Sequence, residues 1–152
     1  MKLENVEKFF DTADRVFQNM IRVETKQKEI KEKEKNFCAK KVTATIGVTG
    51  DYEGFIHFSM DKDTTLKAVE KMTGMEVDEL TKFANSAVGE IANIISGNFI
   101  TDLEYKCDIT PPSIAVADNM NISTDQGAFW VLPLDTEVGT LEIYLLLKKH
   151  KK

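Results

Sequence analysis

The chain has 152 residues, of which 42% are apolar and 30% are charged, and its net charge at neutral pH is −5. Such a length is typical of one globular domain with a core of its own. The acidic balance disfavours a nucleic-acid surface, because phosphate binding needs clustered lysine and arginine. No apolar run approaches the roughly 20 residues that span a bilayer, and the charged first ten residues do not resemble a signal peptide. We therefore expect one cytoplasmic domain, 1–152, with neither nucleic acid nor membrane as a partner.

The two cysteines, Cys38 and Cys107, lie far apart and form neither a CxxC motif nor a zinc-ligand spacing. We expect two reduced thiols, partly buried, and no metal site in this chain.

The N-terminal quarter of the chain predicts a helix followed by a highly charged segment. Residues 3–23 carry their apolar side chains at helical spacing and are expected to form an amphipathic helix. Residues 24–35 contain nine charges of mixed sign and one apolar residue, Ile30. This segment is either a solvated connection or an exposed edge strand with protective lysines.

Residues 42–60 predict a β-hairpin. Apolar and polar residues alternate over 42–49, "TGDYEG" (49–54) supplies a turn, and "FIHFSM" (55–60) returns as a second strand. His57 lies on the opposite face from Ile56 and has no acidic or cysteine partner at ligand spacing. We therefore expect an ordinary strand residue there and not a catalytic group.

Two further helices are expected between the hairpin and the C-terminal third. Asp61 or Asp63 can cap a helix that Gly74 ends. Asp78 is expected to open a second helix, which continues to about Leu103.

The C-terminal part of the chain predicts strands. The two prolines of "DITPPS" (108–113) end the helical pattern and exclude a central strand. "AFWVLPL" (128–134) and "GTLEIYLLL" (139–147) follow as strands joined by "DTEV" (135–138), and both their faces are apolar enough to be covered. The expected fold class is α/β, of the α+β kind, with a mixed or mainly antiparallel sheet and the long helices packed on one face.

The segment 83–101 stands out because its nineteen residues hold a single charged side chain, Glu90. On a helical wheel at about 100° per residue, a broad arc is apolar: Leu80, Phe83, Ala84, Ala87, Val88, Ile91, Ile94 and Ile95. The opposite face holds small and polar residues: Ser86, Gly89, Glu90, Asn93 and Gly97. Glu90 and Asn93 are three residues apart and are neighbours on the helix surface.

Two interpretations of this small-residue face are open. The glycines could let two helices of the same domain pack closely. Alternatively, they could admit the surface of another molecule, since Gly89 and Gly97 each cost the helix about 1 kcal/mol relative to alanine. A buried Glu90 without a cation would be unfavourable, and this helix offers no lysine or arginine within a turn of it. The cation would have to come from elsewhere, such as another protein.

"SAVGEIANIISGN" (86–98) resembles the motif of the CheC/CheX/FliY phosphatases of bacterial chemotaxis, which is Asp or Ser, three residues, Glu, two residues, Asn, and a proline about twenty residues later. Ser86, Glu90 and Asn93 match the first three positions, and Pro111 or Pro112 matches the last with a shorter connection. The resemblance runs from about residue 42 to the C-terminus. The motif occurs once, so the CheX branch is the more similar one.

The resemblance implies that the chain hydrolyses the phospho-aspartate of a CheY-type response regulator. In such proteins the regulator holds the Mg²⁺ and a lysine, and the phosphatase binds no cofactor of its own. Asn93 would then position the attacking water and Glu90 would pair with the regulator's lysine. Ser86, Gly89 and Gly97 would let the regulator come close.

The resemblance also implies a homodimer that pairs sheets across its interface, with the apolar hairpin 128–147 expected at the sheet edge, and it makes a CheD-like regulator possible. The alternative function is a non-catalytic response-regulator-binding or flagellar-switch module on the same fold. A small-molecule hydrolase is disfavoured, because no Ser-His-Asp, Cys-His or metal constellation is present in the sequence.

Overall fold

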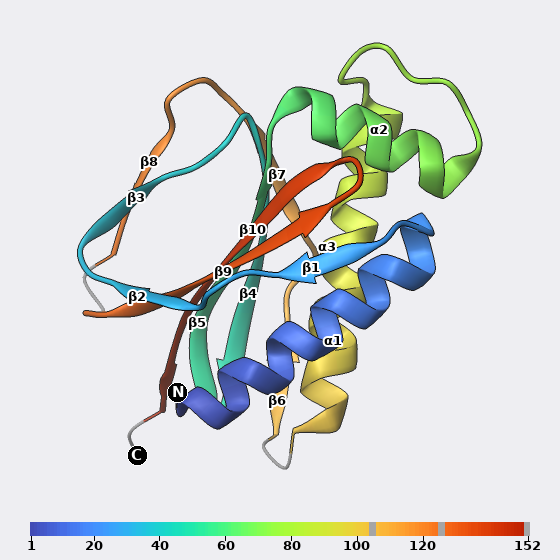
Figure 1. The fold of residues 1–152 in the computed structure, drawn as a ribbon. Coiled ribbons are helices and arrows are strands. Elements are labelled where there is room, and N and C mark those ends of the chain that lie inside the picture. The colour runs from blue at the N-terminus through green and yellow to red at the C-terminus, as the bar shows by residue number, and fades with distance from the viewer. Residues whose placement is uncertain (104–105, 125–126, 151–152) are drawn as a thin grey trace.

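The computed structural model describes residues 1–103, 106–124 and 127–150 (Figure 1). Its helices are α1 (Leu3–Ile21), α2 (Lys62–Thr73) and α3 (Lys82–Asp102). The strands before α3 are β1 (Thr25–Gln27), β2 (Lys31–Lys33), β3 (Asn36–Cys38), β4 (Val42–Gly50) and β5 (Tyr52–Met60). Those after it are β6 (Cys107–Ile109), β7 (Ser113–Val116), β8 (Asn121–Ser123), β9 (Phe129–Thr136) and β10 (Gly139–Lys149).

The main sheet has eight strands in the order β1-β9-β10-β5-β4-β6, with β2 also paired to β9 and β7 also paired to β4. Each pairing of the described strands is antiparallel. The predicted hairpin is β4–β5, which begins with Val42 opposite Met60 and turns at Gly50 and Asp51, so its turn is tighter than the sequence indicated. The fold class is as predicted, α+β with an antiparallel sheet.

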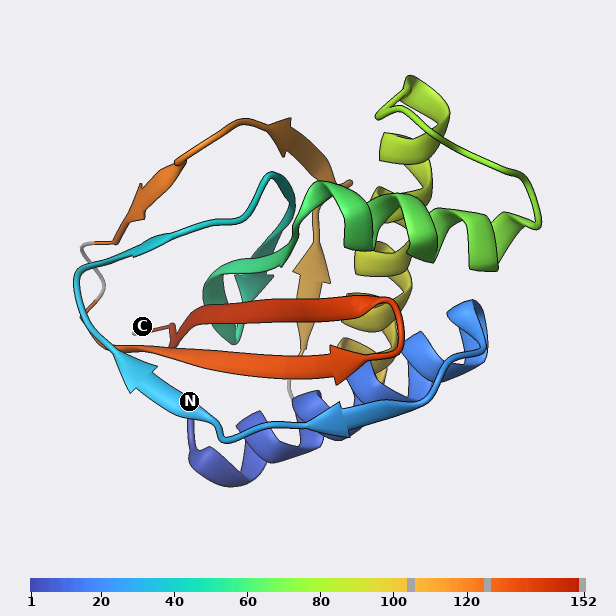
Figure 2. The ribbon, with the colours of Figure 1, turned by 45° about the horizontal axis from the view of Figure 1, so that its top comes forward.

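The three helices lie on one face of this sheet (Figures 1 and 2). The main core forms between them, and the strand alternation decides which side chains enter it. Along β10, for example, Leu141, Ile143 and Leu145 are buried in the core that also holds Phe9 and Ile91. Apolar residues that recur about every 3.6 positions in the helices and every second position in the strands thus pack together in this main core.

The second face of the sheet is covered by a two-stranded ribbon, β3–β8. Phe37 of β3 stacks on the Tyr144 ring, with ring centroids 3.8 Å apart. A smaller core forms there: Phe37, Ala39, Phe129, Val131, Tyr144 and Leu146. The prediction that both faces are covered is confirmed, although the ribbon itself was not foreseen.

The charged segment 24–35 forms β1 and β2 along β9 at the sheet edge, which confirms the edge-strand interpretation. Its exposed lysines protect the unpaired edge from other strands. The hairpin 128–147 was expected at the edge, and this was wrong. β10 lies between β9 and β5, while β1 and β2 cover the outer side of β9.

Candidate functional site

The candidate site is on α3, whose start differs from the prediction. Thr81 caps the helix, because its side-chain hydroxyl accepts a hydrogen bond from the Ala84 N–H at 3.2 Å. Asp78 was expected in this role, and this was wrong, since it lies in the connection before the helix. Threonine satisfies an orphan N–H much as aspartate does. In contrast, Asp61 caps α2 as one of the two predicted candidates, and its carboxylate accepts from the Thr64 N–H at 2.7 Å.

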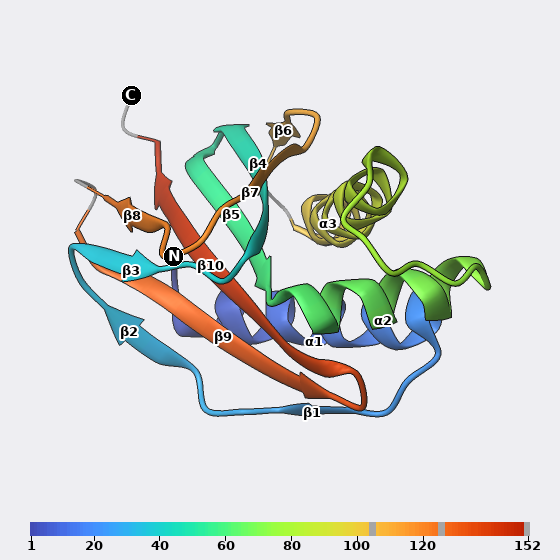
Figure 3. The ribbon, with the colours of Figure 1, turned by 90° about the horizontal axis from the view of Figure 1, so that it is seen from above.

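One side of α3 packs against α1, α2 and the β4 side of the sheet. Figure 3, which looks nearly along this helix, shows ribbon on that side and none on the other. The buried residues follow the predicted apolar arc: Ala84, Ala87, Val88, Ile91 and Ile95 among them. Phe83 was placed in that arc, and this was wrong, because its side chain is 45% exposed.

The three motif residues lie on the open side of α3. Ser86, Glu90 and Asn93 are all exposed, and i, i+4, i+7 spacing places them along one face of the helix. Within the described residues, neither Glu90 nor Asn93 has a hydrogen bond or an ion pair to another side chain. Glu90 is therefore solvated and not buried, and both groups are free to contact a second molecule.

The two glycines of this face differ in what surrounds them. Gly89 is buried, and a Cβ added there would come within 3.1 Å of Pro112 Cγ and 3.5 Å of Ile114 Cδ1. Its small size therefore serves close packing of the segment after α3 against the helix. Gly97 has no atom within 4 Å of an added Cβ. Its missing side chain leaves open space on the surface.

The surface on both sides of Glu90 is hollowed. A shallow depression of about 410 Å³ lies toward the N-terminal half of α3, lined by Ser86, Gly89 and Pro112 among others. A second one of about 340 Å³ lies beside Asn93 and Gly97. Of the two prolines that could match the motif, Pro111 and Pro112, it is Pro112 that lines this depression.

Two other polar side chains of α3, Asn98 and Thr101, are satisfied within the helix, whereas Asn85 Oδ1 and Ser96 Oγ are buried without a hydrogen-bond partner among the described residues. The Asn98 side chain donates to the Ile94 carbonyl at 2.8 Å, and the Thr101 hydroxyl donates to the Gly97 carbonyl at 2.9 Å. Asn93 differs from both, because its amide has no such acceptor.

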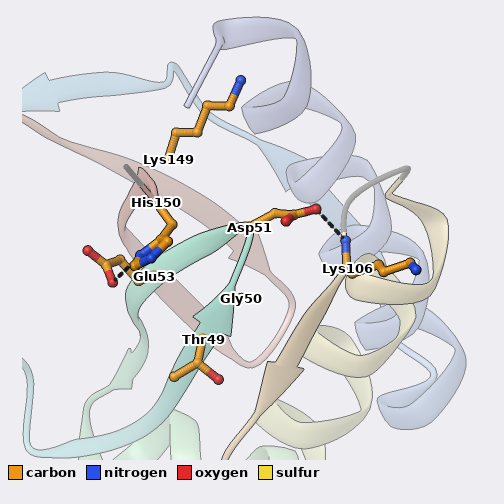
Figure 4. A pocket seen from close by; sticks show the side chains of 7 residues that line it. All are labelled: Thr49, Gly50, Asp51, Glu53, Lys106, Lys149 and His150. Carbon is orange, nitrogen blue, oxygen red and sulfur yellow. Dashed lines mark hydrogen bonds and ion pairs between the residues drawn. The ribbon is translucent and has the colours of Figure 1, made fainter. Parts of the chain in front are cut away.

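A larger hollow of about 750 Å³ lies away from α3, where the β4–β5 turn meets the end of β10 (Figure 4). Two pairs of its polar groups are in contact with each other. The Asp51 carboxylate accepts from the Lys106 N–H at 2.8 Å, and the Glu53 carboxylate lies 3.0 Å from His150 Nδ1. These contacts join the hairpin to β6 and to the C-terminal strand.

The remaining candidates for chemistry have structural roles. His57 is buried on the second face of the sheet, with Nδ1 2.8 Å from the Thr45 hydroxyl, and burial lowers the pKa of His57 to about 4. It stays neutral near pH 7 and is far from the α3 motif in the fold. Cys38 and Cys107 are free thiols; Cys107 is half-buried as expected, whereas Cys38 is exposed, so the prediction for Cys38 was wrong. Residues 1–103, 106–124 and 127–150 contain no group of three or more histidine, cysteine or acidic side chains that could hold a metal ion.

The fold and this surface define an α+β domain in which the open face of α3 presents a free carboxylate and a free amide beside small residues. None of the helices that the structure describes is both long and apolar enough to cross a membrane.

Comparison with known proteins agrees with this class. The family model for the chemotaxis phosphatase CheX matches residues 42–135. The CheY-P phosphatase CheX of Thermotoga maritima is 36% identical over 87 residues, which are 55% of this chain and 56% of that protein. The match thus spans little more than half the length of this relative. The chain belongs to the CheX family of chemotaxis phosphatases.

Solved structures extend the similarity to almost the whole chain. The CheX–CheY–BeF₃–Mg²⁺ complex of Borrelia burgdorferi contains a chain with a TM-score of 0.85 and 27% identity, covering 97% of this chain and 100% of that one. A CheC-like protein from Shewanella sp. PV-4 has a TM-score of 0.86 and 23% identity, over 97% and 99% of the two chains. The second likeness supports the fold alone.

Proposed function

We propose that this chain is a phosphatase that hydrolyses the phospho-aspartate of a CheY-type response regulator. The observation that carries the proposal is the pair Glu90 and Asn93. Both are exposed and without a partner in the described chain, and they occupy neighbouring positions on the open face of α3. Membership of a phosphatase family and the CheX–CheY complex of Borrelia burgdorferi support the same reaction and the same kind of partner.

Asn93 has the chemistry that positioning a water requires. Its amide oxygen can accept a hydrogen bond from the attacking water, and its NH₂ can donate toward a phosphoryl oxygen. The amide carries no charge that would repel the phosphate. Phosphoryl transfer needs mainly alignment and charge stabilisation, so a neutral group that orients water for in-line attack suffices on this side of the reaction.

Glu90 would hold the regulator in place. Its free carboxylate can pair with a lysine of the regulator, and its position one turn from Asn93 sets the amide beside the phosphoryl group. The Mg²⁺ would be held by the regulator, as the composition of the Borrelia burgdorferi complex suggests. This chain then supplies orientation and the partner supplies the cations.

Ser86 and Gly97 would let the regulator approach closely, because neither has a large side chain that protrudes from the open face of α3 on either side of Glu90. Gly89 would act differently from the other two. It lets Pro112 lie against the helix, so its contribution to the partner surface would be through the shape of that packing.

The energetic demand on this site is modest. A hundredfold acceleration corresponds to about 2.7 kcal/mol of transition-state stabilisation. One well-placed hydrogen-bonding group can provide about that much.

The test is the rate of phosphate release from CheY-type regulators loaded with Mg²⁺ and acetyl phosphate, measured with and without this chain. We expect acceleration by the wild type. Because each group does a separate task, Glu90→Ala and Asn93→Ala are each expected to abolish it. Both side chains are exposed, so circular dichroism should report an intact fold. Near-normal acceleration by both variants would contradict the site assignment.

The alternative is a non-catalytic docking or flagellar-switch module on the same fold. The exposed Glu90 favours it as much as it favours the phosphatase, because a charge can recognise a partner without assisting the chemistry. The two functions separate in the same experiment. A docking module binds the regulator and leaves the rate of phosphate release unchanged.

We further propose that residues 1–152 form a single domain and that the chain acts in the cytoplasm together with the regulator. We also propose that it forms a homodimer by pairing sheets and that a CheD-like protein modulates it. For the dimer, the available sheet edges are the short strands β1 and β2 on one side and β6 and β7 on the other.

A further inference from the structure

Phe83 is an exposed aromatic side chain on the helical side of the molecule. The chain has nine phenylalanines, and seven of them are buried, as follows: Phe9, Phe10, Phe17, Phe37, Phe58, Phe99 and Phe129. Phe83 is 45% exposed, and only Phe55, at 48%, resembles it. An exposed aromatic ring has a cost in water that burial against a partner would remove.

The position of Phe83 connects it to the candidate site. It is in the first turn of α3, three residues before Ser86 and seven before Glu90. Seven residues are about two turns, so Phe83 and Glu90 share a face at roughly 10 Å along the helix axis. The line Phe83, Ser86, Glu90, Asn93 runs over about 15 Å, well within one side of an ordinary protein–protein interface.

The composition of this face indicates what Phe83 contributes. Ser86 and Gly97 have almost no side chain to bury, and an exposed ion pair such as the one proposed for Glu90 adds little affinity. Asn93 acts on the reacting groups. Affinity in interfaces comes mainly from a few buried anchors, often aromatic, surrounded by weaker polar contacts. Phe83 is the large exposed apolar group that α3 offers for this purpose.

We propose that Phe83 is the apolar anchor by which this chain binds its response regulator. The inference rests on the proposed function, and the molecule that covers Phe83 is the regulator whose lysine pairs with Glu90. Continuity along one helix face supports this partner, since a molecule that reaches both Glu90 and Asn93 extends over the neighbouring turns. The regulator must then present an apolar patch about 10 Å from the lysine that Glu90 contacts.

The test is the affinity for a CheY-type regulator loaded with BeF₃ and Mg²⁺, measured by titration calorimetry. Phe83→Ala is expected to weaken binding about tenfold, within the range for interface anchors, and Phe83→Leu is expected to recover most of the loss. The matched control is Phe55→Ala. It removes the same side chain at nearly the same exposure from the sheet face that carries His57, away from α3. We expect its affinity to stay within about twofold of the wild type, because a residue outside the interface contributes little to binding.

Dephosphorylation kinetics provide the second readout. Phe83→Ala is expected to raise KM for the phosphorylated regulator and to leave kcat at saturation nearly unchanged, since the lost interaction is made equally in ground and transition states. A kcat that falls with an unchanged KM would overturn the anchor role. So would equal affinities for wild type and Phe83→Ala, or an equal loss in Phe55→Ala. A change of oligomeric state in Phe83→Ala with unchanged regulator affinity would show that a second copy of this chain covers the ring.

The outcomes also separate this inference from the proposed function. If Phe83→Ala weakens binding but the wild type does not accelerate hydrolysis, the anchor role is supported and the phosphatase function is refuted. Acceleration that is unaffected by Phe83→Ala at low regulator concentration would support the phosphatase and refute the anchor. A wild type that does not bind the BeF₃-loaded regulator would refute both.

Discussion

At the scale of single residues, the site is distinguished by what Asn93 and Glu90 lack. Asn98 on the same helix is satisfied by the Ile94 carbonyl, whereas Asn93 has no partner in the part of the chain that the structure describes. The sequence singled out Glu90 because charged residues are otherwise missing from 83–101, and it singled out Asn93 as the neighbour of Glu90 on the helix surface. It could not show that Glu90 is solvated, since that depends on how α3 is placed against its neighbours.

Phe83 and Gly89 show the limit of the helical wheel at this scale. The wheel placed Phe83 in the apolar arc, but it lies at the border of that arc, about 20° from Glu90, and its ring is exposed although the neighbouring Ala84 is buried. Gly89 fell on the polar side, yet Pro112 covers it. Both outcomes depend on contacts with residues distant in sequence, and the periodicity of a helix carries no information about such contacts.

The first prediction concerns His57, whose burial lowers its pKa to about 4 from the ordinary value of 6.5. The unfolded chain binds a proton there between those values and the folded chain does not. Stability from this group is therefore complete above about pH 6.5 and is lost as pH falls toward 4, with a slope of up to about 1.4 kcal/mol per pH unit.

Urea unfolding at pH 7.5 and pH 5.5 measures this slope. His57→Leu removes the titrating group and should show a smaller loss of unfolding free energy between the two pH values, whatever its stability at pH 7.5. Equal losses in wild type and variant would show that His57 does not titrate in this way.

At the scale of elements, the motifs with strong local signals were predicted well. The β4–β5 hairpin, the Asp61 cap of α2 and its end at Gly74 follow from alternation, a capping residue and a left-handed glycine. The short strands β3 and β8 have three residues each, too few to show a period. Their pairing across 121–123 and 36–38 is a long-range contact, so the ribbon over the second face could not be predicted.

The second prediction concerns Gly97 in the interior of α3. No atom lies within 4 Å of an added Cβ, so Gly97→Ala should raise the free energy of unfolding by about 0.5–1 kcal/mol. The methyl group would protrude beside Asn93, and we expect regulator dephosphorylation to slow at the same time. Chemical denaturation and phosphate release measure the two effects. If the variant is stabilised and fully active, Gly97 is not part of the surface that the regulator contacts.

The third prediction concerns Gly139, where the β9–β10 turn meets the first turn of α2. Its φ of +130° is rarely adopted by other residues, and an added Cβ would overlap the Thr64 hydroxyl. Strain and overlap together should make Gly139→Ala less stable by about 2 kcal/mol or more. The midpoint of urea unfolding tests this, and an unchanged midpoint would contradict it. Folded Gly139→Ala should keep its activity, because α3 is untouched.

At the scale of the whole molecule, the sequence predicted the fold class, the helices on one face and a cover on the other. It did not predict the strand order. The hairpin 128–147 was expected at an edge in connection with the dimer that the resemblance implies, but β1 and β2 return from far upstream to pair with β9. The consequence is functional. The edge strands β1 and β2 are charged and short, while α3 keeps an open face on the other side of the core (Figure 3).

The central claim is that Asn93 accelerates hydrolysis of the regulator's phospho-aspartate. The most direct measurement is single-turnover decay of a phosphorylated CheY-type regulator with saturating wild type, Asn93→Ala or Asn98→Ala. We predict about a hundredfold faster decay with wild type, corresponding to about 2.7 kcal/mol. Asn98→Ala should retain it, and Asn93→Ala should lose it while still binding the BeF₃-loaded regulator. Decay with Asn93→Ala as fast as with wild type would contradict the account.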